Sequence, residues 1–393
     1  MAEPARGWRL RGPCGRGFVL LLLGLPLAGC RPHDFPQYPP DYREYMYVTN
    51  GGSNTVSVFD VVNVRVDREL TVGHNPVAVT PSLTRNEVYV VNQGGPGELG
   101  SVSVIDAEAN RVSATIPVRR MPVAIALGPK DDFAYVANSG SNNLSVIDLK
   151  MRRESGVIPV GQEPVSVRLS PDGESLVVAS RRDGQVSIID PATRTVRASF
   201  TGCPGANDVV ILPDSSKAFV ACSAGHQIMS LALARPKTHP HSTDAVESLL
   251  DVGRGPVQLA LKPDGGEVFV ANSLSDSVSE VITGTDDVLG AYMMGDDPVE
   301  GLVSRDNSTL YVGNLHSQEV TVYSIDDGKR VGAIHVGDGP SAMAFSAAGH
   351  LLFVVDSRSG DVAVVRTSSS SLFTFLPAGR NPNAIADKAF KVR

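Results

Sequence analysis

A tetrapeptide of the form Tyr-Val-x-Asn recurs along the chain, and this repeat constrains the fold more than any other feature. Its eight copies begin at Tyr47, Tyr89, Tyr135, Val177, Phe219, Phe269, Tyr311 and Phe353. Five of the seven intervals are 42 residues, and the other two are 46 and 50 residues. A fixed period of this length indicates an architecture in which each repeat forms one supersecondary unit.

Two further markers keep the same phase within each repeat. Gly-x-x-Pro begins at Gly73, Gly161, Gly253, Gly295, Gly337 and Gly379, with degenerate copies at Arg119–Pro122 and around Cys203. Alternating segments such as Ser101–Asp106 and Asn143–Asp148 lie between these markers. Each unit therefore supplies four short β-type runs separated by turn residues. Four-stranded antiparallel units repeated around an axis make a β-propeller, which leaves only short, protected edges.

The tetrapeptide and the Gly-x-x-Pro spacing resemble the YVTN family of bacterial and archaeal surface propellers, over residues 46–390. The only tryptophan is Trp8, so the repeat is not of the WD40 type. Eight copies predict an all-β, eight-bladed propeller, whereas family members often have seven blades, and a seven-bladed ring with one additional unit remains an alternative. The strand expected at Asn383–Phe390 should join residues 46–85 in one blade and close the ring.

The N-terminal segment indicates export and anchoring. Residues 1–17 contain four arginines, and an apolar run at 18–28 is too short for an ordinary transmembrane helix. Leu27-Ala28-Gly29-Cys30 resembles the bacterial lipobox, which implies cleavage before Cys30 and lipidation of its thiol. We therefore expect a signal peptide at 1–29, a lipidated cysteine and extended tether at 30–45, and the propeller at 46–393. A plain secretory signal is the alternative.

This organisation predicts a protein of the bacterial cell envelope that faces the periplasm or the cell exterior, with the membrane as a partner through the lipid anchor. The formal charge of −7 gives no reason to expect a nucleic acid partner, which would need a basic face. The sequence has no Cys-x-x-Cys-His, no Gly-x-Ser-x-Gly and no phosphate-binding loop. We expect no bound cofactor, no metal and no catalytic constellation.

The loops that vary most between repeats identify a candidate ligand site. In a four-stranded blade, the connections from the fourth strand to the next first strand, and from the second to the third, emerge on one face around the axis. Charged residues in these loops could form a funnel for a polar or anionic ligand. The funnel candidates are His74, Arg119, Glu163, His226, Arg254, His316 and Arg380. The alternative is that they are solvated loop residues with no common target.

The fifth repeat departs most from the pattern. Cys203 and Cys222 both lie towards the loop side of this unit and could form a disulfide. Antiparallel pairing would place Cys222 opposite Asn207, so Cys203 approaches it only if the loop folds back. An insertion in the same unit carries His239, His241 and Asp244, which could form a weak metal site, but an ordinary surface loop is the preferred interpretation.

Two classes of function follow. The preferred one is a non-catalytic binding or scaffolding propeller whose loop face contacts a protein, a glycan or a small molecule. The alternative is an enzyme with its site in the channel, because similar propellers include lactonases and the large subunits of quinone-dependent amine dehydrogenases. His74, Glu163, His226, His316 and Arg380 are the residues that such an enzyme would use. Fold alone does not decide between the two.

Overall fold

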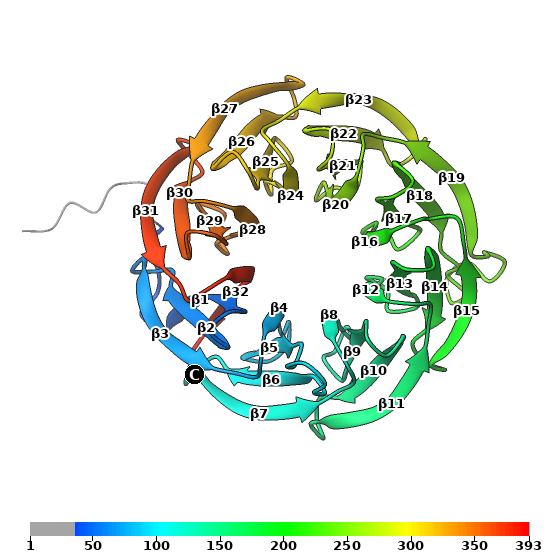
Figure 1. Cartoon of the computed structure of the whole chain (residues 1–393), viewed down its shortest axis with the longest axis horizontal. Helices are drawn as coiled ribbons and strands as arrows, with labels where there is room; N and C mark the ends of the chain where they lie inside the picture. Colours follow the sequence, from blue (N-terminus) through cyan, green and yellow to red (C-terminus); the bar gives the residue numbers. More distant parts are fainter. Residues whose placement is uncertain (1–35, 393) are drawn as a thin grey trace, which may run out of the picture. The chain divides into compact units, whose positions relative to one another are not determined.

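A computed structural model describes residues 36–392 of the chain, and this part forms a ring of eight four-stranded antiparallel sheets (Figure 1). The prediction of an eight-bladed propeller is confirmed. No helix within residues 36–392 is long and apolar enough to cross a membrane.

The blades are numbered in chain order, and the strands of each blade are given in their order from the axis to the rim (Figure 1). Blade 1 contains β32(Pro382–Lys391), β1(Tyr42–Asn50), β2(Thr55–Asp60) and β3(Arg65–Thr71), and blade 2 contains β4(Pro76–Pro81), β5(Glu87–Asn92), β6(Ser101–Asp106) and β7(Arg111–Pro117). Blade 3 contains β8(Pro122–Leu127), β9(Phe133–Asn138), β10(Asn143–Asp148) and β11(Arg153–Pro159), and blade 4 contains β12(Pro164–Leu169), β13(Leu176–Ser180), β14(Gln185–Asp190) and β15(Thr195–Phe200). Blade 5 contains β16(Ala206–Ile211), β17(Lys217–Cys222), β18(Gln227–Ala232) and β19(Ala245–Asp251), and blade 6 contains β20(Pro256–Leu261), β21(Glu267–Asn272), β22(Ser277–Ile282) and β23(Asp287–Met293). Blade 7 contains β24(Pro298–Val303), β25(Thr309–Asn314), β26(Glu319–Ser324) and β27(Lys329–His335), and blade 8 contains β28(Pro340–Phe345), β29(Leu351–Asp356), β30(Asp361–Arg366) and β31(Ser371–Pro377).

The tetrapeptide repeats because it ends the second strand of each blade, where every position is buried. Its asparagine side chain ties that strand to the third. Asn138 Nδ2 donates to Ser145 Oγ at 2.9 Å, and Asn314 Nδ2 donates to Thr321 Oγ1 at 2.9 Å. A buried amide without such a partner would lose free energy, so the asparagine and the hydroxyl recur together. The motif is therefore structural.

The apolar core lies between neighbouring blades. Tyr135 and Leu144 of blade 3 pack in one cluster with Val167 and Val178 of blade 4, and similar clusters join other pairs of blades. Each blade buries both of its faces, which is why the second strand is mostly apolar and the middle residues of the third strand are buried. A blade removed from the ring would expose these faces, so the ring is stable only when closed.

The ring closes by pairing the two ends of the chain, as the sequence predicts. In blade 1, β32 pairs with β1, and Met46 lies opposite Asp387. The expected span of 46–85 for the first part of this blade is too long, because β4 at Pro76–Pro81 starts blade 2. The pairing also begins earlier than expected, since β1 starts at Tyr42, within the segment that the sequence assigns to the tether.

Blade 5 contains a disulfide between Cys203 and Cys222, with a Cα–Cα distance of 4.7 Å. The strand register differs from the expected one, because Cys222 lies opposite Ala206 and the pairing then shifts. Ala206 N donates to Cys203 O at 3.0 Å, so the loop turns back on itself and brings the two cysteines together. Gly205, with φ of +71°, provides the left-handed conformation that this turn needs.

Candidate functional site

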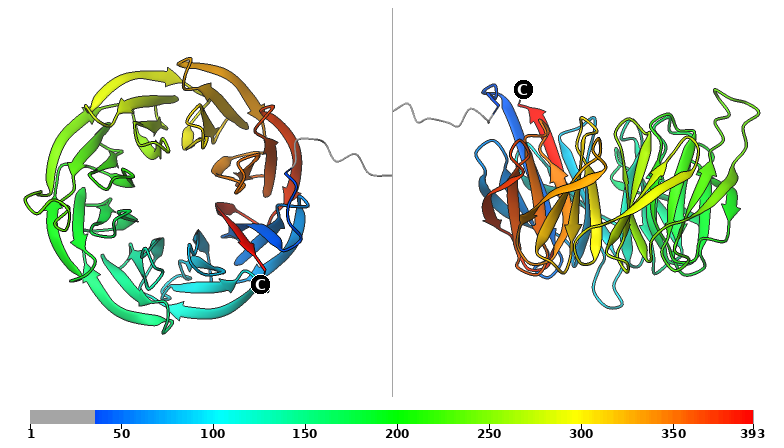
Figure 2. Two further views of the ribbon diagram at one scale, coloured as in Figure 1. Left: turned by 180° about the vertical axis from the view of Figure 1, so that it is seen from behind. Right: turned by 90° about the horizontal axis from the view of Figure 1, so that it is seen from above.

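The propeller has two different faces. The loop face consists of the fourth-to-first and second-to-third connections, which bond to each other: Ser139 N donates to Met121 O at 2.9 Å. The terminal face consists of the other turns, together with the start of β1 and the end of β32. The side view in Figure 2 shows the loop after β5 projecting from one face and the loop after β18 from the other. Both chain ends of the described part lie on the same side as the loop after β18.

The funnel candidates lie in loop-face connections, but the structure does not bring them together. Each side chain with a polar contact uses a neighbour in its own part of the ring. His74 Nδ1 lies 2.8 Å from Glu98 Oε2, and His316 Nδ1 lies 2.9 Å from Asp297 Oδ2. The other pairs are Arg119 with Glu154, Glu163 with Arg181 and Arg182, and His226 with the backbone of Gly255.

Arg254 and Arg380 differ from the other funnel candidates. Within the described residues, their guanidinium groups make no hydrogen bond or ion pair, and both residues are exposed. Arg120, which follows Arg119 in the connection between blades 2 and 3, is also exposed and its side chain has no partner among the described residues. The loop face therefore presents three unpaired positive charges on different blades, which would favour the approach of an anion without forming one site.

A pocket of about 320 Å³ lies on the loop face between blades 3 and 4. Met121, Asn142, Glu163 and Arg182 line it with Ser139 and Gly140. Glu163 and Arg182 face each other at 3.7 Å and are largely satisfied by this ion pair. The pocket thus contains one funnel candidate, and that residue is already partnered.

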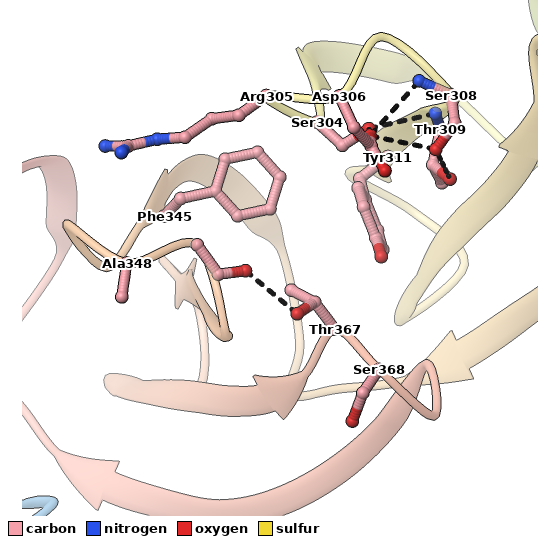
Figure 3. Close-up of a pocket in the computed structure, with 11 residues that line it drawn as sticks. Ser304, Arg305, Asp306, Ser308, Thr309, Tyr311, Phe345, Ala348, Thr367 and Ser368 are labelled. Carbon is pink, nitrogen blue, oxygen red and sulfur yellow. Dashed lines mark hydrogen bonds between the residues drawn. The ribbon is translucent and has the colours of Figure 1, made fainter. Parts of the chain in front are cut away.

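A second pocket, of about 330 Å³, lies on the terminal face between blades 7 and 8 (Figure 3). Its floor is Tyr311 and Phe345, and its rim carries Arg305 and several hydroxyl groups. A pocket of about 260 Å³ between blades 3 and 4 has the equivalent repeat positions, with Tyr135 and Leu169 in place of the two aromatic residues. The repeat itself produces this type of hollow, so its presence does not mark a specific site.

The innermost strands show a stronger departure from the repeat. The third residue of each innermost strand is small in five blades: Ala78, Ala124, Ser166, Ala342 and Ala384. In the three consecutive blades 5, 6 and 7 it is Asp208, Gln258 and Glu300. Alanine at the equivalent positions indicates that the fold does not need a polar side chain here. We call these three residues the axial arc.

Sequence reasoning missed the axial arc, although a signal was present. The strand after each Gly-x-x-Pro has a regular apolar pattern, which indicates architecture and hides the exceptions. Aligning the residues two positions after the proline, which is Ala206 in the fifth repeat, shows Asp, Gln and Glu in consecutive repeats, where the others have Ala or Ser.

Two members of the axial arc connect adjacent blades. Asp208 Oδ2 accepts from Leu259 N of β20 at 3.1 Å, and its other oxygen lies 3.5 Å from Arg168 of β12. Gln258 accepts from Gly301 N at 2.8 Å and donates to Gly301 O at 3.2 Å. These side chains satisfy backbone groups on the free edge of the next innermost strand, so both have a structural role.

Glu300 has no such role. Within the described residues its carboxyl group makes no hydrogen bond or ion pair, although it is half-buried beside the axis. Burial, together with the charge of Asp208 and against the opposing charge of Arg168, raises the pKa of Glu300 to about 8. A carboxyl group with a strongly raised pKa and no structural partner is a functional-site candidate.

The insertion of blade 5 does not build a metal site. Asp244 is bound by Arg197, whose Nη2 donates to Oδ1 at 2.8 Å, and it also accepts from Ala234 N. Among the described residues, the imidazole of His239 makes its hydrogen bond with the adjacent Thr238 side chain. In residues 36–392 no group of three His, Cys, Asp or Glu residues could hold a metal ion. The ion pair instead fixes the base of the loop.

Comparison with known proteins supports the fold and leaves the activity open. No protein-family model matches the chain. A stretch of 97 residues is 30% identical to a seven-bladed beta-propeller protein of Mycobacterium tuberculosis, Rv1057. This match spans 24% of the chain and 24% of that protein. The chain is therefore similar to a propeller protein over about a quarter of its length.

Solved structures match a larger share of the ring. The dihydro-heme d1 dehydrogenase NirN has a TM-score of 0.71 at 15% identity, over 90% of this chain and 76% of NirN. Citrobacter koseri AztD has a TM-score of 0.67 at 11% identity, over 90% and 99% of the two chains. A protein of Bacteroides uniformis, provisionally assigned as a 6-phosphogluconolactonase, has a TM-score of 0.61 at 17% identity, over 88% and 100%. At these identities the likeness concerns the fold alone.

Proposed function

We propose that this chain is a non-catalytic binding propeller, held on the bacterial cell envelope by lipidated Cys30, which takes a ligand at its axis. The observation that carries the proposal is Glu300, an unpartnered carboxyl group at a position where four other blades have alanine. Keeping an ionisable group half-buried and unbonded costs folding free energy, so its presence favours a role outside folding.

Binding is preferred over catalysis because the loop-face residues do not converge. None of the seven funnel candidates contacts another by a hydrogen bond or an ion pair, and five of them are bonded to neighbours. The channel-enzyme alternative would rest on Glu300 as a general acid or base, since a pKa near working pH suits that role.

The position of the chain ends suggests how an anchored propeller would be oriented. The segment before Tyr42 joins the ring on the terminal face, and Val392 N donates to Asp41 O at 2.8 Å beside it. If Cys30 carries lipid, the terminal face is nearer the membrane and the loop face points into the aqueous compartment. A soluble ligand or partner would then reach the axis from the loop face.

The anchor is tested by Cys30→Ser in the full chain. We expect this variant to be recovered from the soluble fraction after the cells are broken, while the unmodified chain stays with membranes. A variant that remains membrane-bound contradicts the anchor.

Binding at the axis is tested by thermal denaturation of the purified chain with 1,4-diaminobutane, inorganic phosphate or glucose. These probes represent a cation, an anion and a neutral polyol. We expect at least one to raise the melting temperature of the unmodified protein. The effect should be lost in Glu300→Gln and kept in Glu108→Gln, which makes the same change on an exposed turn of the terminal face. If no probe acts, or if both variants respond equally, the axial site is wrong.

A further inference from the structure

The surroundings of Glu300 indicate the chemical class of its ligand. We infer that the axial site binds a small organic cation with a primary ammonium group, which the Glu300 carboxylate and the backbone carbonyls of neighbouring innermost strands would hold. This inference rests on the proposed function, because it names the ligand of the same site.

The first argument is the balance of charge beside the axis. Arg168 and Asp208, on the innermost strands β12 and β16, lie 3.5 Å apart and neutralise each other. The ionised form of Glu300 has no such neighbour. The uncompensated charge at this part of the ring is therefore negative when Glu300 is ionised, which favours a cation.

The second argument is the supply of hydrogen-bond acceptors. β24 pairs only with β25, and β28 pairs only with β29, so each has a free edge on the axial side. A free strand edge presents backbone carbonyl groups. On β24 the Gly301 carbonyl already accepts from Gln258, so the carbonyls left for a ligand are the others on this edge and those of β28. An ammonium group has three donors and no acceptor, so it can bond to the carboxylate and to two such carbonyls together.

Two glycines lie next to Glu300 in the fold. Glu300 is followed by Gly301, where other innermost strands have a larger apolar residue, and it lies opposite Gly313 of β25. A Cβ on Gly301 would lie 3.0 Å from Ala260 Cβ, so this glycine allows β20 to approach closely. A Cβ on Gly313 would meet Glu300 Cβ and Pro340 at ordinary contact distances. Gly313 is itself buried, so both glycines serve the close packing around β24.

An organic cation fits better than a metal ion. A hard divalent cation takes six or more oxygen ligands, several of them from carboxylates. Glu300 and Asp208 are two carboxylates, and Asp208 is already occupied by Arg168 and Leu259 N. The described part of the chain has no cluster of three ligating side chains.

Binding should release a proton. Burial raises the pKa of Glu300, so near neutral pH the free protein holds the carboxyl group mostly as the acid. The bound ammonium favours the carboxylate, and the proton leaves to the buffer while the ammonium keeps its own. β20 and β28, which flank β24, have no ionisable side chain. The adjoining strands β21 and β25 each have one, Glu267 and Tyr311. Asp208 and Arg168 are the remaining charges that act on Glu300.

The test is isothermal titration calorimetry of the full chain with 1,4-diaminobutane between pH 6 and 8.5, in two buffers of different ionisation enthalpy. We expect proton release, and an affinity that rises up to about tenfold per pH unit and levels off near pH 8. Glu300→Gln should weaken binding about 10- to 100-fold and abolish the pH dependence, while Glu108→Gln should change neither. Tetramethylammonium, which has the charge but no donors, should bind more weakly than the diamine.

The outcomes separate this inference from the proposed function. If phosphate or glucose binds in a manner that requires Glu300 and the diamine does not, the cation assignment is wrong and the axial site stands. If tetramethylammonium binds as well as the diamine, the hydrogen-bonded ammonium is wrong. If no probe depends on Glu300, both proposals fail.

Discussion

Asp356 provides the sharpest prediction about stability, because it replaces the asparagine of the repeat at a fully buried position. Its Oδ2 accepts from Gly337 N at 2.9 Å, as Asn314 Oδ1 accepts from Gly295 N. Its Oδ1 is buried and has no hydrogen-bond partner. Burial, opposed by the hydrogen bond from Gly337 and assisted by the charge of Asp361, raises the pKa of Asp356 to about 8.

The consequence is a stability that falls as the pH rises. Between about pH 4 and pH 8 the folded protein keeps the proton of Asp356 and the unfolded chain has lost it, so raising the pH favours unfolding. One proton corresponds to at most about 1.4 kcal/mol per pH unit. Asp356→Asn removes this pH dependence, because an amide does not titrate. The new amide nitrogen could donate to the side chain of Asp361, as Asn138 Nδ2 donates to Asn143 Oδ1 in blade 3.

The assay is urea unfolding followed by circular dichroism at several pH values between 5 and 9. We expect Asp356→Asn to exceed the unmodified protein in free energy of unfolding by a margin that grows up to about pH 8 and is then constant. Ala363 stands where Ser145 stands in blade 3, so adding Ala363→Ser should stabilise Asp356→Asn by about a further 1 kcal/mol. A margin that does not vary with pH would refute the reasoning.

Three further perturbations test other parts of the account. Replacing Cys203 and Cys222 together by alanine should lower the free energy of unfolding by about 3 kcal/mol, because the disulfide closes a loop with a sequence separation of 19. The unfolding midpoint of the double variant should match that of the reduced parent protein. A midpoint equal to that of the oxidised parent contradicts the prediction. Asp244→Ala leaves the partly buried guanidinium of Arg197 without its carboxylate, so we expect the free energy of unfolding to fall by about 2 to 4 kcal/mol. His239→Ala on the same insertion should lower it by under about 0.5 kcal/mol. Equal effects of the two variants in thermal denaturation would show that the ion pair does not fix the loop. Burial and the neighbouring Glu44 raise the pKa of Asp387 at the ring closure. Asp387→Asn should therefore reduce the fall in the free energy of unfolding as the pH rises. Unfolding curves that keep the pH dependence of the parent protein would contradict a contribution of Asp387.

The sequence was sufficient for the architecture because each marker has a separate structural requirement. Asn138 must meet a hydroxyl seven residues later, and Asp148 must accept from Met151 N in the turn after the third strand. The asparagine–hydroxyl pair recurs in five of the eight blades and the aspartate in four, always in the same phase, so their period indicates the number of blades. The start of β1 at Tyr42 escaped prediction, because the pairing extends beyond the motif into a stretch rich in proline and tyrosine.

The candidate site was less predictable, because it depends on groups from different repeats. Glu300 is one residue in an otherwise apolar strand, and its lack of a partner is a property of three dimensions. The disulfide likewise depends on a turn at Gly205 that shifts the register of one strand. The funnel residues were correctly placed in the loops, but their local ion pairs depend on neighbours such as Glu98 that no motif identifies.

Titration of the Glu300 side-chain carboxyl group by carbon-13 NMR tests the central claim most directly. The chain would be labelled at glutamate, and the signal assigned by its absence from Glu300→Gln. The account predicts a pKa of about 8 in the free protein and a decrease of that pKa on addition of 1,4-diaminobutane. A pKa in the ordinary range of glutamate, about 4.3, that the diamine leaves unchanged would contradict the claim that the axis of this propeller is its binding site.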